Sequence, residues 1–429
     1  MYKLKFSVAV FGFIWFTSTP GTGETHLTHN EGTEKIHPSG AKLTITVPQE
    51  LQHSRIYVNQ QVVGVMVGQS RLFQLPAGVD LTIQAKKPPF ESKIEFFFLT
   101  KGREEKLSLE LFAPQRTLEL CRNPTKEQRR TLEVLANTAK VSYHPEHCVA
   151  LYERLFDLQT LNLSNAKLVD LSPLRGINQI TSLDLSSNNI QDLRPLSGMI
   201  RLTELVLNHN QIEDISPIQH LSKLRLLWVN DNQLDELPDL GGLGGLRSLK
   251  LSENQLLRLE PLGALGNLSH LKLDHNQISE LGPLSTLEQL EYLTANNNQI
   301  KNPNPLSKLP LLGRLELSSN QIVDLKGLRT KSNLSWLDLS NNQIQSLEPL
   351  GNKNRLYYLD LSENKVGDLS PLEGLTGLTD LFLHGNPIKD LRPIRDLKNL
   401  KNLTFSKTPQ LNTAGVSERS TPKEYVHDD

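Results

Sequence analysis

The chain has 429 residues, enough for two or three domains. Its 46 basic and 47 acidic residues leave a net charge of −1, which excludes a general electrostatic attraction to nucleic acid or to acidic membranes. Aromatic residues make up only 6% of the chain, whereas leucine and asparagine recur so often that they indicate a repeat architecture more than an ordinary enzyme.

The N-terminus has the composition of an export signal. Two lysines precede an apolar run of 11 residues, FSVAVFGFIWF, which is too short to cross a bilayer as a helix. Small residues follow, with Gly21 and Gly23 at suitable positions for cleavage. We therefore expect a signal peptide over residues 1–23 and an exported mature chain (in the periplasm, at the cell surface or secreted) with no transmembrane segment. The alternatives for the apolar run are a buried strand or a membrane anchor.

Short alternating runs follow a polar segment, residues 24–40, that predicts a flexible linker. Between residues 41 and 114 each run is four to seven residues long, and Gly or Pro separates the runs, as in KKPPFES (86–92). Many short strands at this spacing predict a small β-sandwich. The runs are KLTITV (42–47), RIYVN (55–59), VVGV (62–65), RLFQL (71–75), DLTIQA (80–85), KIEFFF (93–98) and KLSLELF (106–112).

Two stretches of this segment, IYVNQQVVGV (56–65) and LPAGVDLTI (75–83), resemble the PEGA-type surface domain. That family has an Ile/Val-Tyr-Val-Asp-Gly strand, a Val-Gly step and then Leu-Pro-Ala-Gly. Asn59 and Gln60 stand where the family usually has Asp-Gly, so the first hairpin turn is expected to be looser. The resemblance implies an envelope-associated spacer or binding module, and no chemistry.

Residues 115–157 predict a helical cap over the end of the repeats that follow. Asn123-Pro124 favours an N-cap with proline at the first helical position, and a second short helix is expected near Pro145. Cys121 and Cys148 bracket the first of these helices. In an exported chain a lone pair of cysteines is most simply one disulfide, and closing this loop would contribute about 3–4 kcal/mol. A reactive thiol or a metal pair is the alternative, but the sequence supplies no partners for either.

An asparagine recurs every 22 residues through most of the remaining chain. The pattern LxxLxLxx precedes each one, and an apolar residue stands two places after it. Residues 158–407 contain eleven full repeats and a partial one, with Ala166 in the first asparagine slot, and residues 408–429 are expected to be a disordered tail. The asparagines are Asn188, Asn210, Asn232, Asn254, Asn276, Asn298, Asn320, Asn342, Asn364 and Asn386.

This period and pattern are typical of leucine-rich repeats. The resemblance implies a solenoid in which each LxL forms a strand of one parallel sheet, with the leucines inside and the residues between them on a concave face. We expect each asparagine amide to satisfy buried backbone groups at the turn after the strand. A proline recurs on the opposite, convex side, and because proline breaks helices it predicts tight 3-10 turns there.

The complete prediction is a leucine-rich repeat solenoid with an N-terminal small β-sandwich and a helical cap. Its 22-residue, proline-bearing repeats resemble those of bacterial internalins and of a eukaryotic phosphatase-1 regulatory subunit, and the export signal favours the first. Three residues depart from the pattern. Pro303 replaces a leucine or isoleucine, and Lys331 and Lys353 replace the last apolar residue of the convex side, so we expect a loosened convex wall or a local bend there.

The aromatic side chains of the full repeats fall on the predicted sheet, at or just before the LxL motif. Solvent-facing aromatics are enriched in binding hot spots, although strands also favour aromatics without any function. Four of them lie on three adjacent repeats and are expected to form one patch, from Trp336 to Phe382. The predicted partner-binding residues are Trp228, Tyr292, Trp336, Tyr357, Tyr358, Phe382, Arg247, Lys250, Lys272, Glu316, Asp338 and Asp360.

Charge on the predicted sheet changes sign along the repeats. Like charges directly side by side are mildly destabilising, and a ligand of complementary charge would relieve that repulsion. The acidic half has a structural alternative, because aspartate is common in the LDLS segment of such repeats. The N-terminal half carries Arg225, Arg247, Lys250 and Lys272, and the C-terminal half carries Glu316, Asp338, Asp360, Glu363 and Asp380.

No pattern in the sequence predicts catalysis, a metal site or a cofactor. Four histidines are expected on the concave side, but His209 and His275 lie three strands apart, about 14 Å, too far to share a metal. The chain has no HExxH, P-loop, GxSxG or paired CxxC motif. The glycine-rich stretch GGLGG (241–245) lies in a convex segment and lacks the Lys-Ser/Thr of a phosphate loop.

The sequence therefore predicts an exported, non-catalytic protein-binding module that recognises a protein partner on its concave sheet, of the adhesion type directed at host or prey. The alternative is a structural envelope component that binds glycan or another part of the cell envelope. A third hypothesis is an intracellular phosphatase-regulatory scaffold, which requires that the N-terminal apolar run is not a signal. We expect no nucleic-acid partner under any of the three.

Overall fold

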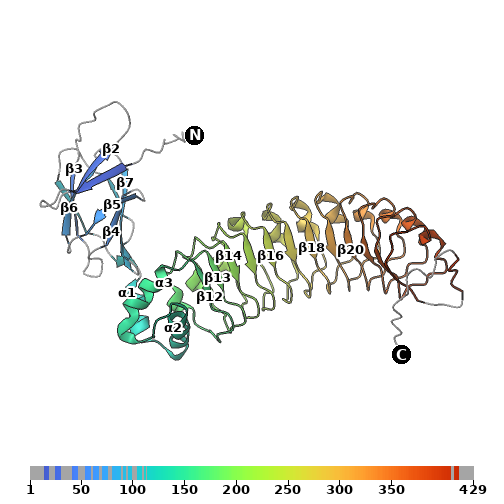
Figure 1. Cartoon of the computed structure of the whole chain (residues 1–429), viewed down its shortest axis with the longest axis horizontal. Helices are drawn as coiled ribbons and strands as arrows, with labels where there is room; N and C mark the ends of the chain where they lie inside the picture. The colour runs from blue at the N-terminus through green and yellow to red at the C-terminus, as the bar shows by residue number, and fades with distance from the viewer. Residues whose placement is uncertain are drawn as a thin grey trace. The chain divides into compact units, whose positions relative to one another are not determined.

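The chain divides into two compact units in this computed structural model, and each is described by itself (Figure 1). The first comprises Met1–Thr125 with Ser142–Asp157, and the second Lys126–Val141 with Leu158–Asp429. No helix among the described residues is long and apolar enough to cross a membrane. The structure describes residues 14–18, 25–29, 41–46, 54–58, 61–66, 70–75, 80–87, 90–92, 95–98, 104–108, 111–112, 114–406 and 410–414.

The first unit contains a hairpin, β1 (Ile14–Ser18) with β2 (Thr25–His29), and two further sheets. One sheet has the order β10-β3-β6, in which β3 runs parallel to β10 and antiparallel to β6. The other has the order β11-β8-β7-β4-β5, with β9 added against β7. Their bounds are β3 (Ala41–Thr46), β4 (Arg55–Val58), β5 (Gln61–Val65), β6 (Ser70–Leu75), β7 (Asp80–Lys87), β8 (Phe90–Ser92), β9 (Glu95–Phe98), β10 (Glu104–Ser108) and β11 (Leu111–Phe112).

At least one strand overlaps each of the seven alternating runs, and Ile45, Ile56 and Ile83 from three of those strands have no exposed surface. Two further strands, β8 and β2, were not expected, and a third, β1, matches the strand alternative for the apolar run rather than the leader. β8 lies in the segment taken as a turn because of its prolines, and β2 lies in the segment expected to be a flexible linker. β1 lies in the predicted leader, whose cleavage position is outside the described residues. Pairing with a neighbouring strand, which composition does not reveal, accounts for these differences. The β-sandwich and the PEGA-type resemblance stay predictions.

Three helices follow the sheets. α1 (Pro114–Arg122) starts on a proline, which suits the first helical turn, and α2 (Lys126–Thr138) starts two residues later than expected. The expectation that Pro124 opens α2 is wrong: Thr125, a residue type favoured at N-caps, stands immediately before the helix instead. The second predicted helix is present, as the 3-10 turn η2 (Pro145–His147) followed by α3 (Cys148–Phe156).

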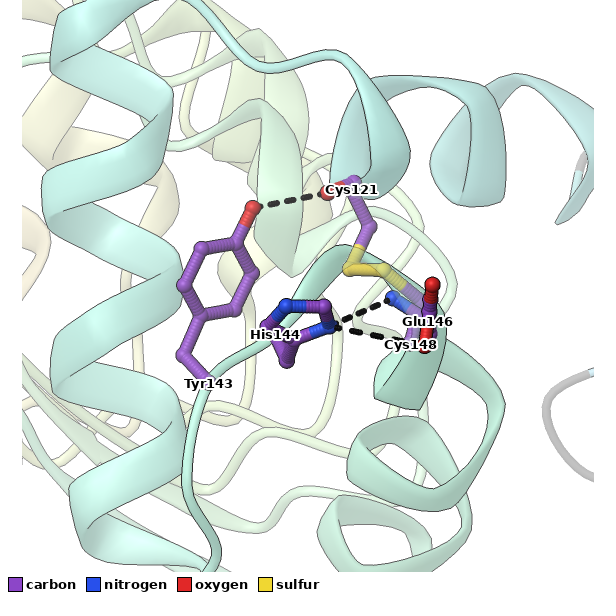
Figure 2. The surroundings of a disulfide bond; sticks show 5 residues. All are labelled: Cys121, Tyr143, His144, Glu146 and Cys148. Atoms are coloured by element: carbon purple, nitrogen blue, oxygen red, sulfur yellow. Dashed lines mark hydrogen bonds and ion pairs between the residues drawn. A yellow bond between two sulfur atoms is a disulfide. The ribbon is translucent and has the colours of Figure 1, made fainter.

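Cys121 of α1 and Cys148 of α3 form a disulfide, with their Cα atoms 6.0 Å apart (Figure 2). The Tyr143 hydroxyl donates a hydrogen bond to the Cys121 carbonyl oxygen at 2.8 Å. His144 Nδ1 accepts one from the backbone N–H of Glu146 at 3.4 Å, which caps the start of η2. The disulfide and the Tyr143 hydrogen bond hold the segment after residue 142 against α1.

The second unit is a leucine-rich repeat solenoid built on one parallel sheet of twelve strands, which follow one another along the solenoid in Figure 1. Each strand residue is paired with the residue 22 positions later in the next strand, so the sequence period is also the register of the sheet. The strands are β12 (Thr160–Asn162), β13 (Ser182–Asp184), β14 (Glu204–Val206), β15 (Leu226–Trp228), β16 (Ser248–Lys250), β17 (His270–Lys272), β18 (Tyr292–Thr294), β19 (Arg314–Glu316), β20 (Trp336–Asp338), β21 (Tyr358–Asp360), β22 (Asp380–Phe382) and β23 (Asn402–Thr404).

The convex side consists of one 3-10 turn per full repeat, as the proline column predicts. Most of these turns have proline at their first or second position, and each buries an apolar residue. The turns are η3 (Ser172–Leu174), η4 (Arg194–Leu196), η5 (Ser216–Ile218), η6 (Gly241–Leu243), η7 (Glu260–Ala264), η8 (Gly282–Thr286), η9 (Asn304–Lys308), η10 (Lys326–Leu328), η11 (Glu348–Leu350), η12 (Ser370–Leu372) and η13 (Arg392–Ile394).

The repeating asparagines connect each coil to the one before it. Asn188 Oδ1 accepts hydrogen bonds from the backbone N–H groups of Ala166 and Leu168 at 3.1 and 2.9 Å. Its Nδ2 donates to the carbonyl oxygens of Leu163 and Leu185 at 3.0 and 2.8 Å. The other nine asparagines are buried in the same position and repeat most of these contacts. Because buried backbone groups are costly to leave unpaired, one asparagine in each of ten coils fixes the turn after the strand.

Lys331 and Lys353 are buried, with 4% and 1% of their surface exposed, so the loosened convex wall expected around them is not found at these side chains. Lys331 Nζ donates a hydrogen bond to the Leu309 carbonyl oxygen at 2.6 Å, and Lys353 Nζ donates to that of Arg329 at 2.7 Å. The aliphatic stems take the place of the usual apolar side chain, and the ammonium groups reach a carbonyl of the preceding coil. Burial lowers the pKa of both lysines.

Different segments contact the two ends of the solenoid. At the N-terminal end, the Thr131 hydroxyl of α2 donates to the Asp170 carbonyl oxygen at 2.7 Å, and Arg130 Nε donates to that of Ala166 at 2.9 Å. At the C-terminal end, Asn412 pairs with Asp390 in a parallel bridge. The disordered tail predicted from residue 408 therefore contains ordered residues 410–414, because the last coil has no successor to pair with its backbone.

Candidate functional site

The outward side chains of strands β12–β23 form one surface, which we call the sheet face. Because every strand is shifted by 22 residues, equivalent positions of neighbouring coils lie directly side by side. The position before the first buried leucine places five large side chains in consecutive strands, in the order His270, Tyr292, Arg314, Trp336 and Tyr358.

These side chains contact one another through their flat faces. The rings of Trp336 and Tyr358 are stacked, with centroids 3.6 Å apart and planes 3° apart. The Arg314 guanidinium lies 4.1 Å from the Trp336 ring centroid and 5.2 Å from that of Tyr292. Phe382 lies outside this row, directly opposite Asp360 in the next strand, but its ring centroid is 5.4 Å from that of Tyr358. We call this set the aromatic stack.

Tyr357 lies at the edge of the aromatic stack and is 43% exposed. Its ring meets that of Trp336 edge to face, with centroids 6.0 Å apart. Trp336 Nε1 is covered and has no hydrogen-bond partner in the described part of the chain. The predicted patch from Trp336 to Phe382 is therefore assembled side by side, with aromatic surface open to solvent.

A row of three carboxylates runs beside the aromatic stack, at the position between the two buried leucines. Glu316, Asp338 and Asp360 are directly opposite one another in β19, β20 and β21, and we call them the acidic row. Glu316 pairs with Arg314 at 2.6 Å. Asp338 Oδ1 accepts hydrogen bonds from the N–H and hydroxyl of Ser340 at 3.0 and 2.8 Å.

The acidic row perturbs the groups within and beside it. Burial raises the pKa of Asp338, and the nearby charges of Asp360 and Glu316 raise it further, while the hydrogen bonds from Ser340 oppose the shift. Burial raises the pKa of Tyr358 as well, and Asp360 adds to that effect. Negative charge is therefore concentrated beside the aromatic stack, and among the described residues only Glu316 of the three carboxylates has an ion-pair partner.

The basic end of the sheet face contains a hollow of about 300 Å³ across strands β15–β18. Lys250 and Lys272 are directly opposite each other in β16 and β17. The ammonium of Lys250 lies 3.4 Å from the Trp228 ring centroid, and that of Lys272 lies 5.4 Å from the Tyr292 ring centroid. Burial lowers the pKa of Lys250, and the charge of Lys272 contributes. The hollow is lined by Trp228, Ser248, Leu249, Lys250, His270, Lys272 and Tyr292.

Not every predicted residue joins these groups. Arg247 is exposed but does not line the hollow, and Arg225 instead donates through Nη1 to the Gly245 carbonyl oxygen at 2.8 Å. Arg314 belongs to the aromatic stack and was missed, although its position 22 residues from both Tyr292 and Trp336 was a sufficient signal.

The histidines of the sheet face have separate partners. His209 Nδ1 lies 2.7 Å from Asp231, and His275 Nε2 lies 3.3 Å from the Asn297 amide. No group of three or more His, Cys, Asp or Glu side chains among the described residues is arranged to hold a metal ion.

Comparison with known proteins finds leucine-rich repeats in both sequence and structure. Residues 200–242 and 332–374 match the family described as Leucine Rich repeats (2 copies). A search of curated proteins finds no significant match.

Several solved structures are similar to this chain. An internalin of Listeria monocytogenes, InlF, is 26% identical with a TM-score of 0.58, over 70% of this chain and 95% of that one. The functional domain of InlJ from the same organism has 23% identity and a TM-score of 0.58, over 68% and 62% of the two chains.

A plant structure shares the fold over a shorter length. The leucine-rich repeat ectodomain of the receptor kinase GASSHO1/SCHENGEN3 from Arabidopsis thaliana, solved in complex with CASPARIAN STRIP INTEGRITY FACTOR 2, has 26% identity and a TM-score of 0.51, over 60% of this chain and 34% of that one. The second unit of this chain is thus a leucine-rich repeat solenoid whose fold is similar to that of Listeria internalins.

Proposed function

We propose that this chain is an exported, non-catalytic recognition protein that binds a protein partner on the concave sheet face. The aromatic stack is the observation that carries this function. Trp336 and Tyr358 present stacked rings on the face, and Tyr357 adds exposed aromatic surface beside them. Large aromatic side chains with little freedom to lose are the residues that dominate binding at protein interfaces.

The similarity to internalins and to a plant receptor ectodomain supports binding rather than catalysis. The plant ectodomain was solved in complex with a separate factor. Residues that a sheet needs only for folding do not have to be aromatic on the outward side, since in an early coil Ser182 stands at the position of Trp336 and Tyr358, and Asp184 at that of Phe382. The aromatic side chains of the later coils are an addition to the scaffold.

Export rests on the predicted signal peptide and fits the disulfide between Cys121 and Cys148, because disulfides persist mainly in oxidising compartments. The PEGA-type segment would place the solenoid at the cell envelope. A structural envelope role with glycan as the ligand is the alternative, since an exposed aromatic ring such as that of Tyr357 also suits a sugar ring. Binding to purified cell wall instead of protein would favour it.

The test uses the two stacked residues. Cross-linking in the native cell identifies the partner, and Trp336→Ala with Tyr358→Ala is expected to reduce its capture at least a hundredfold, because two anchors are removed. Circular dichroism and the melting temperature should be almost unchanged. Capture at the original level by this variant would contradict the proposal.

The matched control is Ile200→Ala with Leu257→Ala. Both residues are large, apolar and exposed, and neither lies in a strand of the sheet. This variant removes exposed apolar surface away from the aromatic stack, so it should capture the partner as well as the unmodified chain does. An equal loss in both variants would mean that general surface hydrophobicity, not the aromatic stack, drives capture.

A further inference from the structure

The hollow at the basic end of the sheet face shares His270 and Tyr292 with the aromatic stack but does not include Trp336 or Tyr358. Its walls come from four adjacent strands, with Trp228 at one end and Tyr292 at the other. Lys250 and Lys272 lie between these two rings. A concave site of about 300 Å³ with aromatic walls and two cations is large enough for one or two side chains of a ligand.

The two ammonium groups are not neutralised by the chain itself. No carboxylate of the described residues forms an ion pair with Lys250 or Lys272. Two positive charges directly opposite each other in neighbouring strands repel, and both are held near aromatic faces. An anion placed between them would remove this repulsion.

Asp274, two residues after Lys272, is occupied elsewhere. Its Oδ2 accepts hydrogen bonds from the hydroxyls of Thr294 at 2.6 Å and Ser252 at 3.2 Å, and its Oδ1 accepts one from the Asn296 N–H at 2.9 Å. These three contacts hold the carboxylate in the sheet edge. The fold therefore supplies an acid close to Lys272 in sequence and uses its carboxylate to hold neighbouring coils together.

We propose that this hollow binds a carboxylate of an acidic peptide segment in the protein partner, with apolar side chains of the same segment against Trp228 at one end and Tyr292 at the other. The inference rests on the proposed function, because it names the chemistry recognised at one part of the same sheet face. The carboxylate lies between the ammonium groups of Lys250 and Lys272, where charge-assisted hydrogen bonds to both are available.

The charge of the rest of the sheet face favours a peptide over a uniformly anionic polymer. Three strands beyond Lys272, about 14 Å away, the acidic row begins to dominate with Asp338 and Asp360. A sulfated glycan or a nucleic acid lying along the sheet would meet that row with charges of the same sign. A peptide changes its charge from residue to residue, so it can present an acid to the hollow and a neutral or basic residue to the acidic row.

Calorimetric titration of the full chain with acetyl-(Glu-Phe)₃-amide tests the inference. The peptide is expected to bind, and Lys250→Gln with Lys272→Gln should weaken it at least tenfold. Lys223→Gln with Lys308→Gln removes two exposed lysines outside the strands and should leave the affinity within a factor of two. Both variants are expected to melt like the unmodified chain. A charge-inverted peptide, acetyl-(Lys-Phe)₃-amide, should not bind at the hollow.

Four outcomes would overturn the proposal for the hollow. One is no binding of the acidic peptide up to millimolar concentration, and another is equal weakening of its binding in both lysine variants. The other two are equal binding of the charge-inverted peptide that persists without Lys250 and Lys272, and binding of heparin at these lysines in place of the peptide. Trp336→Ala with Tyr358→Ala should leave the titration unchanged. If the hollow does not bind acidic peptide, the titration shows it. If the proposed function is wrong, the partner-capture experiment shows it.

Discussion

Residues at the same position of different coils can keep the same hydrogen bonds while their neighbours on the sheet face differ. Asp338 and Asp184 occupy the same position and accept the same two hydrogen bonds from the serine two residues later. Their neighbours differ. Asp184 stands between Asn162 and Val206, whereas Asp338 stands between Glu316 and Asp360. Repulsion is therefore added to a common scaffold contact in the acidic row.

We predict that Asp338→Asn stabilises the chain at neutral pH by roughly 0.2–1 kcal/mol for each like-charged neighbour relieved. The pKa of Asp338 is raised by burial and by its acidic neighbours, so the folded chain keeps this proton to a higher pH than the unfolded chain. Its contribution to the free energy of unfolding therefore falls as the pH rises through that titration, and is lowest at neutral pH. Asparagine removes the dependence and can keep the hydrogen bonds from Ser340.

Urea unfolding between pH 3 and pH 7 measures this difference. The advantage of the variant over the unmodified chain should grow with pH. Asp184→Asn is the control, since it preserves the equivalent bonds from Ser186 and has no charged residue directly opposite it. A gain of the same size in both variants would rule out repulsion within the acidic row as the cause.

Among the elements, α1 and α3 depend most on one covalent link. Each has only nine residues, a length at which an isolated helix is marginal in water. The disulfide joins them across a sequence separation of 27 residues, and the Tyr143 hydrogen bond reinforces the same contact. These short helices are thus held by their connection more than by their own propensity.

Cys121→Ser with Cys148→Ser is expected to cost about 3–4 kcal/mol in the stability of this segment, from the entropy of the opened loop. Hydrogen exchange of the α1 and α3 amides measures the loss directly. Tyr143→Phe keeps the disulfide and removes one hydrogen bond, so it should cost only about 1 kcal/mol. Unchanged exchange in the serine variant would show that packing alone holds the helices.

At the scale of the whole second unit, the solenoid is a linear array in which each coil contacts its neighbours. The first coil has α2 on one side in place of a preceding coil, and α2 reaches it through Thr131 and Arg130. Disturbing this contact should therefore loosen the first coils without reaching the aromatic stack.

Arg130→Ala with Thr131→Val removes both hydrogen bonds while keeping the shape of the buried threonine. Each lost bond costs about 1 kcal/mol, so amide exchange in β12 and β13 should accelerate about tenfold or more. Exchange in β19 and β20 should stay the same. Asn137→Ala, on an exposed position of α2, is the control. Equal acceleration along all twelve strands would mean that the array unfolds as one unit.

The repeat architecture was predictable from the sequence because a single period determines the strands, the turns and their register together. The position of Arg314 in the aromatic stack followed from that register but not from its residue type. Burial of Lys331 and Lys353 could not be predicted, because it depends on a carbonyl of the preceding coil that the ammonium can reach. The start of α2 and the ordered residues near Asn412 depend on local pairing, which no periodicity reveals.

The fixed 22-residue register sets the distance between any two groups on the sheet face by the number of coils between them. The hollow and the acidic row are separated by a count of coils, and each coil adds one strand spacing of about 4.8 Å. Duplicating one coil between β18 and β19 would lengthen that separation by one strand spacing and leave both groups of residues intact. Gain or loss of whole repeats would therefore change the distance between the hollow and the acidic row, and so the length of ligand that can reach both, without altering the residues of either.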